Sequence, residues 1–178
     1  MHPHRYRVRP AQLGWLLTAT LTVGLALYCG AARPATSAAA PAEAQLHSQE
    51  RELVALLNAA RAESGAPPLE IDSVLTAAAR GHCREMAAKQ YFAHFSPTEE
   101  LRTPLDRYRR AAGERATSVR IAENIYFCSA VSAERAHQAL MASDPHRRNM
   151  LMKGWSRVGV GVHISAAGEF WVTQMFSS

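Results

Sequence analysis

The chain has 178 residues, 48% of them hydrophobic, which fits one globular domain with a substantial core. Its net charge of +5 is unevenly distributed, because residues 1–33 hold four arginines and no acidic residue. Residues 34–178 carry 16 basic against 15 acidic side chains, so the composition argues against a nucleic-acid-binding surface.

The N-terminus predicts a secretory signal peptide in residues 1–32. A basic start is followed by an apolar run of sixteen residues, Leu13 to Tyr28, and then by small residues suited to cleavage. The alternative is an uncleaved membrane anchor, for which the run is short. We therefore expect a secreted, periplasmic or cell-surface protein, with a flexible linker at 33–47 and the folded domain at 48–178.

Apolar residues at helical spacing dominate the first part of this domain. Ser48, Asp72 and Ser132 are candidate N-terminal caps, and Gly65 and Gly113 end two of the patterns. The expected helices run from Ser48 to Gly65, from Asp72 to Gln90, from Thr103 to Gly113 and from Ser132 to Ser143.

The end of the chain alternates with the period of a β-strand. Residues 155–165 alternate valines with glycines, residues 169–176 alternate large apolar side chains, and a tight turn at 165–168 separates them. Residues 121–130 fit either a short turn or a strand. Helices followed by a hairpin, with glycines that allow another layer to approach, predict an α+β sandwich.

Three short motifs carry the candidate chemistry: FAHFSP around His94, AEN around Glu123 and DPHRRN around His146. Each places an ionisable side chain in a segment expected to be non-helical, where binding groups concentrate. Two histidines and a carboxylate could bind a divalent cation such as zinc, with an open position for water. They could equally form a hydrogen-bonded cluster that ties loops together, and the spacing does not decide between the two.

Four further features have a structural interpretation beside a functional one. Cys83 and Cys128 are predicted to form a disulfide in an oxidising compartment, although both could be small buried side chains. His82 is expected to be a partnered core histidine, and Asn124 to hold a turn. The arginines between 102 and 120 are expected to form a solvated face rather than an anion-binding patch.

Six stretches, in order from about residue 50 to the C-terminus, resemble the superfamily of cysteine-rich secretory proteins, antigen 5 and pathogenesis-related 1 proteins, most closely its bacterial branch. They are LLNAARAESGAPPLEID, LTAAARGHCREMAAKQYFAHFSP, TPLDRYRRAAG, IAENIY, SDPHRRNML and VGVGVHISAAGEFWVTQMF. The resemblance implies a three-layer α-β-α sandwich with a central antiparallel sheet. It also implies a cleft lined by two histidines and two acidic residues.

The residues of this chain match that cleft in part. His94 and His146 match the two histidines and are the candidate metal ligands, and Glu123 matches one acid. At the place of the second acid this chain has Leu140 and then Ser143. Ser143 and Asn124 complete the set of expected cleft residues.

Three functions fit these residues. The first is a binding module for a lipid, a sterol-like molecule or an envelope component, which the resemblance permits. The second is a metal-assisted hydrolase, peptidase- or nuclease-like, with Glu123 as general base. The third is an extracellular scaffold. Because no persuasive nucleophile is present, we prefer a binding module or scaffold to an enzyme, and we expect a monomer without a nucleic-acid partner.

Overall fold

The computed structural model describes residues 46–113 and 119–178. The predicted signal peptide and the predicted linker up to residue 45 lie outside the described residues. Leu46, near the end of the predicted linker, is only 5% exposed and packs in the core. Among the described residues, no helix is both long and apolar enough to span a bilayer.

The four predicted helices and the predicted final hairpin form in the predicted order. The helices are α1 (Ser48–Glu63), α2 (Ser73–Lys89), α3 (Pro104–Ala112), α4 (Ala133–Ala142) and α5 (Asp144–Leu151), with a short 3-10 helix, η2 (Glu99–Leu101). The strands are β1 (Glu70–Ile71), β2 (Ile121–Cys128), β3 (Arg157–Ile164) and β4 (Phe170–Ser177). Three of these elements, η2, α5 and β1, were not predicted.

The predicted N-terminal caps Asp72 and Ser132 are confirmed, whereas the predicted cap Ser48 is wrong, because His47 is the N-cap of α1. Thr103 caps α3. The caps of α2, α3 and α4 satisfy backbone N–H groups that the helix itself leaves free. The carboxylate of Asp72 accepts the N–H groups of Val74 and Leu75 at 2.8 and 2.9 Å. The hydroxyls of Thr103 and Ser132 accept N–H groups in the first turns of α3 and α4.

The expectation that His146 lies in a loop is wrong, because its segment forms α5. Ser143 has an extended backbone, with ψ of 117°, and this residue alone separates α4 from α5. Pro145 fits the first turn of α5, where a backbone N–H has no partner within the helix. His146 is therefore carried by a helix rather than by a flexible connection.

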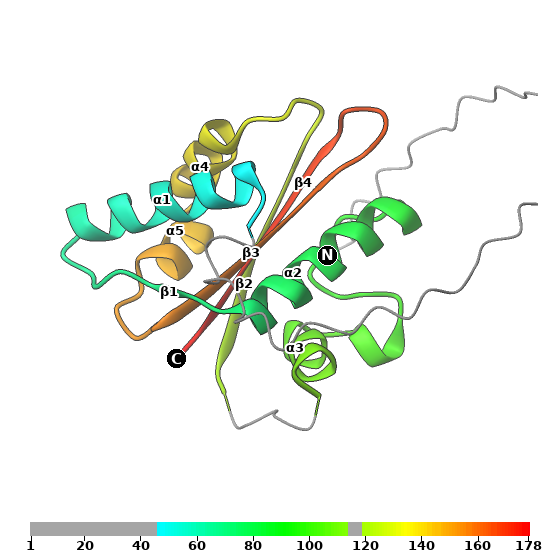
Figure 1. Cartoon of the computed structure of the whole chain (residues 1–178), viewed down its shortest axis with the longest axis horizontal. Helices are drawn as coiled ribbons and strands as arrows, with labels where there is room; N and C mark the ends of the chain where they lie inside the picture. Colours follow the sequence, from blue (N-terminus) through cyan, green and yellow to red (C-terminus); the bar gives the residue numbers. More distant parts are fainter. Residues whose placement is uncertain (1–45, 114–118) are drawn as a thin grey trace, which may run out of the picture.

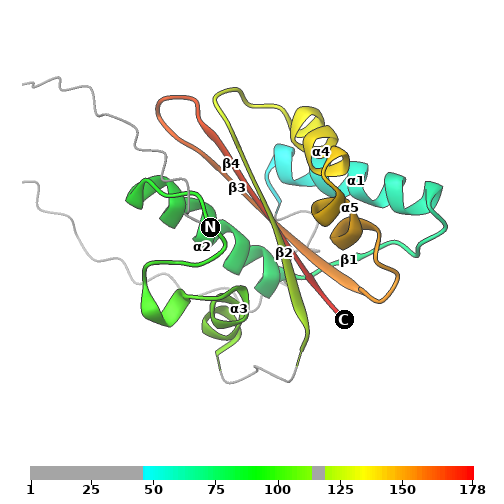
Figure 2. The same cartoon turned by 180° about the vertical axis from the view of Figure 1, so that it is seen from behind.

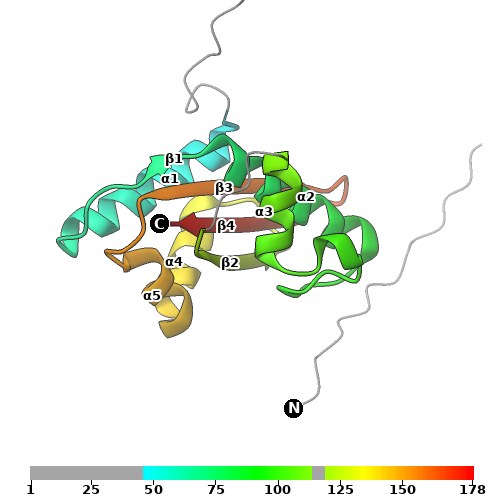
Figure 3. The same ribbon diagram turned by 90° about the horizontal axis from the view of Figure 1, so that it is seen from below.

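The strands form one sheet in the order β1-β3-β4-β2, which Figure 3 shows from below. The strands β2, β3 and β4 are antiparallel, and the two-residue β1 adds a short parallel edge beside β3. In Figure 1 and, from behind, in Figure 2, α1, α4 and α5 lie on one side of the sheet and α2 and α3 on the other. The predicted three-layer α-β-α sandwich is confirmed.

Two glycines let α2 pack directly on β3. A Cβ atom at Gly159 would lie 2.2 Å from the backbone carbonyl carbon of Leu75, and one at Gly161 would lie 2.2 Å from the backbone nitrogen of Arg80. No side chain fits at such distances, so the backbone of the helix rests on the strand. This contact sets the position of α2, and with it the start of the loop that carries His94.

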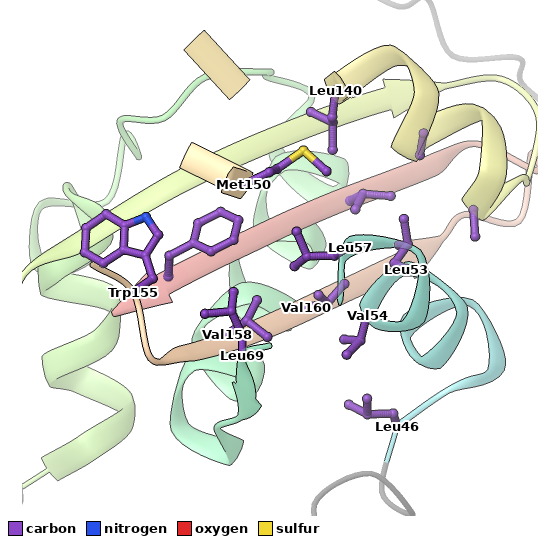
Figure 4. Packing of buried hydrophobic residues seen from close by; sticks show 14 of the residues in the cluster. Leu46, Leu53, Val54, Leu57, Leu69, Leu140, Met150, Trp155, Val158 and Val160 are labelled. Carbon is purple, nitrogen blue, oxygen red and sulfur yellow. The ribbon is translucent and has the colours of Figure 1, made fainter. Parts of the chain in front are cut away.

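The other face of the sheet carries the larger hydrophobic core. The side chains of Val158 and Val160 meet Leu53 and Leu57 of α1, as Figure 4 shows. Leu140 and Met150 bring α4 and α5 into the same cluster. Its members are Leu46, Leu53, Val54, Leu57, Leu69, Ala133, Ala136, Leu140, Met150, Trp155, Val158, Val160, Phe170, Val172 and Phe176.

The predicted disulfide is wrong, because Cys83 and Cys128 are free thiols on opposite faces of the sheet. Cys83 of α2 lies 3.2 Å from the hydroxyl of Thr173, within the α2 layer. Cys128 of β2 interacts instead with Tyr126 and with Arg135 of α4. A disulfide requires Cα atoms within about 7 Å and Cβ atoms that point toward each other, which two faces of one sheet do not provide.

Candidate functional site

Glu123 lies at the centre of the polar cluster, on the edge strand β2. Its carboxylate is 1% exposed and has both oxygens engaged. Oε1 lies 2.9 Å from Nδ1 of His94, and Oε2 accepts a hydrogen bond of 2.6 Å from Nη2 of Arg107. The carboxylate therefore joins the loop after α2 to the helix α3.

Arg107 is the cluster residue that the sequence analysis missed. It is buried, although it was expected on a solvated face, and that expectation is wrong. Besides Glu123, its guanidinium donates to the carbonyl oxygens of His94 at 3.0 Å and Leu101 at 2.9 Å. Its ion-pair partner lies sixteen residues further along the chain, so no local pattern marks this arginine among its neighbours.

The hydrogen bond to Glu123 orients the imidazole of His94. A carboxylate accepts, so Nδ1 carries a proton, and in the neutral ring Nε2 presents its lone pair away from Glu123. The side chain of His94 is 45% exposed. The chain thus presents an accessible acceptor nitrogen, held in one tautomer by a buried carboxylate.

His82 of α2 is the partnered core histidine that the sequence predicted. It is fully buried, and its Nε2 lies 3.1 Å from the carbonyl oxygen of Ala93 and 3.9 Å from Oε1 of Glu123. Burial lowers the pKa of His82 to about 4, against the opposing effect of the Glu123 carboxylate. The neutral ring donates to Ala93 and so holds the residue that precedes His94.

Asn124 points to the opposite face of the sheet, toward α5. Its Nδ2 donates to the carbonyl oxygen of His146 at 3.1 Å and to Oε1 of Gln174 at 3.2 Å. Its Oδ1 accepts from Nδ2 of Asn149 at 3.0 Å. Asn124 was expected to hold a turn. It lies instead inside β2, and it ties α5 to the sheet.

The two histidines named by the motifs approach the same edge of the sheet from different layers. His146 is half-buried, and burial, together with the nearby His94 imidazole, lowers the pKa of His146. His94, Glu123, Asn124 and His146 are therefore brought together around the edge of β2. Ser143 lies three residues before His146, at the junction of α4 and α5.

The cluster does not fit a resident zinc ion. Between residues 46 and 178, leaving out 114–118, no group of three or more His, Cys, Asp or Glu side chains could hold a metal. The carboxylate of Glu123 is already engaged by His94 and Arg107. Because protein zinc sites use three or four protein ligands, the two imidazoles of His94 and His146 are too few.

An α-β-α sandwich whose sheet edge gathers two histidines and a buried glutamate defines the class of secreted proteins that the sequence resembles. Residues 54–176 match the sequence model of the cysteine-rich secretory protein family, abbreviated CAP. The chain belongs to this family, which confirms the resemblance found in the sequence.

Comparisons with individual relatives agree with this family membership. The protein YkwD of Bacillus subtilis strain 168 is 32% identical over 139 residues, which cover 78% of this chain and 51% of that protein. The chain therefore spans about half the length of this relative. An extracellular protein with an SCP domain from Bacillus anthracis is 30% identical, with a TM-score of 0.59 over 72% of this chain and 39% of that one.

A more distant structure shares the fold alone. An outer surface protein of Borrelia burgdorferi is 14% identical, with a TM-score of 0.61 over 73% of this chain and 92% of that chain. The α-β-α sandwich is thus common to proteins with very different sequences, and the site has to be argued from the residues of this chain.

Proposed function

We propose that this chain is an exported binding module of the cell envelope or extracellular space, with His94 and His146 as its ligand-contacting groups. Export is supported by the basic and apolar leader in residues 1–28 and by the extracellular relative from Bacillus anthracis. The observation that carries the binding role is the His94–Glu123–Arg107 arrangement. The buried side chains of Glu123 and Arg107 pair with each other and hold one accessible imidazole in a defined orientation.

The ligand that we propose is amphiphilic, such as a lipid, a sterol-like molecule or another envelope component. Phe92 and Phe95 flank His94 and are 44% and 64% exposed. Phe92 also packs near Phe127 and Trp171, with ring centroids 6.2 and 6.3 Å apart. Apolar rings beside an acceptor nitrogen suit a molecule with a hydrocarbon part and a hydroxyl group.

The hydrolase alternative has less support from the same geometry. A general base needs a carboxylate oxygen within reach of the proton that it removes. Both oxygens of Glu123 are engaged, and the carboxylate is buried. Glu123 is better suited to orienting His94 than to activating a water molecule.

Native mass spectrometry of the protein purified from an exporting host tests this proposal. The wild-type protein is expected to carry a co-purified small molecule, or to take up a stoichiometric sterol or fatty acid that is added as a probe. A His94→Ala/His146→Ala variant should lose the adduct. A His137→Ala/His163→Ala variant is the matched control and should keep it.

Three results would contradict the proposal. If the wild-type mass stays bare with every probe, or if both double variants keep the adduct equally, the histidine cluster is not the binding site. If the wild-type protein instead hydrolyses a peptide or nucleic-acid substrate, and Glu123→Gln abolishes that turnover, the hydrolase hypothesis replaces the binding-module hypothesis.

A further inference from the structure

The carboxylate of Glu85, on α2, collects hydrogen bonds from the loop that carries His94. Its side chain is 10% exposed. The hydroxyl of Tyr91 donates to Oε2 at 2.9 Å, and the hydroxyl of Ser96 lies 2.9 and 2.8 Å from the two oxygens. The hydroxyl of Thr98 donates to Oε1, and Lys89 reaches the same oxygen at 3.0 Å.

These donors lie on both sides of His94 in the chain. Tyr91 precedes it by three residues, while Ser96 and Thr98 follow it by two and four. The hydroxyl of Ser96 also accepts the N–H of Thr98 at 2.9 Å, and the N–H of Ser96 donates to the carbonyl of Arg102 at 2.9 Å. One carboxylate therefore closes the loop around the histidine.

The hydrogen bonds to Glu85 favour the ionised form of its carboxylate. Burial alone would raise the pKa of Glu85. The hydrogen bonds from Thr98, Lys89, Ser96 and Tyr91 outweigh burial and lower the pKa to about 2. An ionised acceptor makes stronger hydrogen bonds than a neutral one, so the loop is held by charge-assisted bonds.

We propose that Glu85 is a positioning residue for His94. Glu85 makes no hydrogen bond to the His94 imidazole or to Glu123. It acts by fixing the loop so that Nδ1 of His94 meets the Glu123 carboxylate. This inference rests on the proposed function only in taking His94 as a ligand-contacting group. The placement of the imidazole can be tested without any ligand.

Imidazole NMR of the full domain, labelled with 15N, tests the proposal directly. In the wild-type protein the neutral His94 ring should carry its proton on Nδ1. In Glu85→Ala the ring should lose this single tautomer and approach the mixture of a free histidine. Hydrogen exchange should become about tenfold faster or more at the amides of Ser96 and Thr98, with little change in the sheet.

Two variants separate positioning from general loss of stability. Asp72→Ala removes the N-terminal cap of the same helix, which lowers stability without touching the loop, and it should leave the His94 signals unchanged. If Glu85→Ala does not fold, Tyr91→Phe/Ser96→Ala removes two of the donors while keeping the carboxylate. That variant should shift His94 in the same direction by a smaller amount.

Unchanged His94 signals and unchanged exchange in the Glu85 variant, or in the double variant, would overturn this inference. Equal shifts in Asp72→Ala would overturn it as well. Neither result would bear on whether His94 and His146 hold a ligand, because the NMR measurement contains none. A missing adduct in the mass spectrum would conversely leave the positioning role of Glu85 intact.

Discussion

Glu123 and Asn124 are neighbours on β2, but their side chains hold the two halves of the site from opposite faces of the sheet. Glu123 contacts His94 and Arg107 in the α2 and α3 layer, and Asn124 contacts the backbone of His146 in the α5 layer. Successive side chains of a strand alternate between faces, so a Glu-Asn pair can serve both layers at once. The edge position of β2 then lets the two histidines approach each other around the strand.

The Glu123–Arg107 pair should be essential for stability. Glu123→Gln leaves the Arg107 guanidinium buried without its counter-ion, and we expect the free energy of unfolding to fall by about 3 kcal/mol. Urea unfolding at pH 7 measures this loss. In the Glu123→Gln/Arg107→Gln double variant the loss should be smaller than the sum of the single losses, and strict additivity would show that the two charges do not depend on each other.

Asn124→Ala should displace His146 without displacing His94. The substitution leaves the carbonyl of His146 and the side chain of Gln174 without their partner, which costs about 1–3 kcal/mol. Imidazole NMR should show the His146 signals shifted and the His94 signals in place. The matched control is Asn58→Ala, because Asn58 makes similar side-chain bonds to Leu69, far from α5 in sequence. A His146 shift of equal size in the control would contradict the assigned role.

The glycines of β3 should not tolerate alanine. Gly159→Ala and Gly161→Ala each place a Cβ atom within 2.2 Å of the backbone of α2, and we expect losses of about 3 kcal/mol or failure to fold. Gly81→Ala, on α2 itself, is the control. Apart from the neighbouring backbone of α2 itself, no atom lies within 4 Å of the new Cβ there, so removing a mid-helix glycine should stabilise the protein by about 0.5–1 kcal/mol. Thermal unfolding of the three variants measures this contrast.

His82 should make the protein sensitive to mild acid. The folded pKa of about 4 lies below the ordinary histidine value of 6.5, so the unfolded chain binds a proton more readily than the folded one. The stabilisation is complete above pH 6.5 and is lost as pH falls toward 4, by about 2 kcal/mol between pH 7 and pH 5.

Urea unfolding across this range compares the wild-type protein with His82→Gln, whose amide can still donate to Ala93 but does not titrate. The variant should lose less stability on acidification than the wild-type protein. Parallel curves for the two proteins would show that His82 does not cause the acid sensitivity.

The chain has three cysteines, and the two that the structure describes, Cys83 and Cys128, should behave as free thiols of unequal reactivity; the third, Cys29, lies in the predicted signal peptide. Burial raises the pKa of Cys83 to about 12, whereas Cys128 is partly exposed at the end of an edge strand. In a Cys29→Ser background, thiol titration of the exported protein should detect Cys128 in the native state. It should detect Cys83 only after unfolding. A protein without titratable thiols, whose mass is two hydrogens lower, would show that the disulfide forms after all.

The segment Asp144–Leu151 illustrates why part of the site could not be predicted. Its eight residues are mostly polar, and they include a proline, which favours a loop on local grounds. Tertiary contacts support the helix instead. The buried guanidinium of Arg61 donates to the carbonyl oxygens of Met150 and Met152 at 2.7 and 3.0 Å, at the C-terminal end of α5.

Local chemistry determined much of this protein. The apolar spacing of the helices, the caps at Asp72, Thr103 and Ser132, and the alternation of the final hairpin all depend on residues within one or two turns of each other. These features can therefore be predicted from the sequence. The motifs around His94, Glu123 and His146 also identified the polar residues that meet, because their order along the chain is that of a known family.

Only the tertiary structure decided which of these groups touch. The pairing of Glu123 with Arg107 and the separation of Cys83 from Cys128 depend on which faces of β2 Glu123 and Cys128 occupy. Successive residues of a strand point to alternate faces of the sheet. The helical layers that cover the sheet then decide which residues each face contacts. The position of these layers is set by packing between segments far apart in sequence, on which local spacing carries no information.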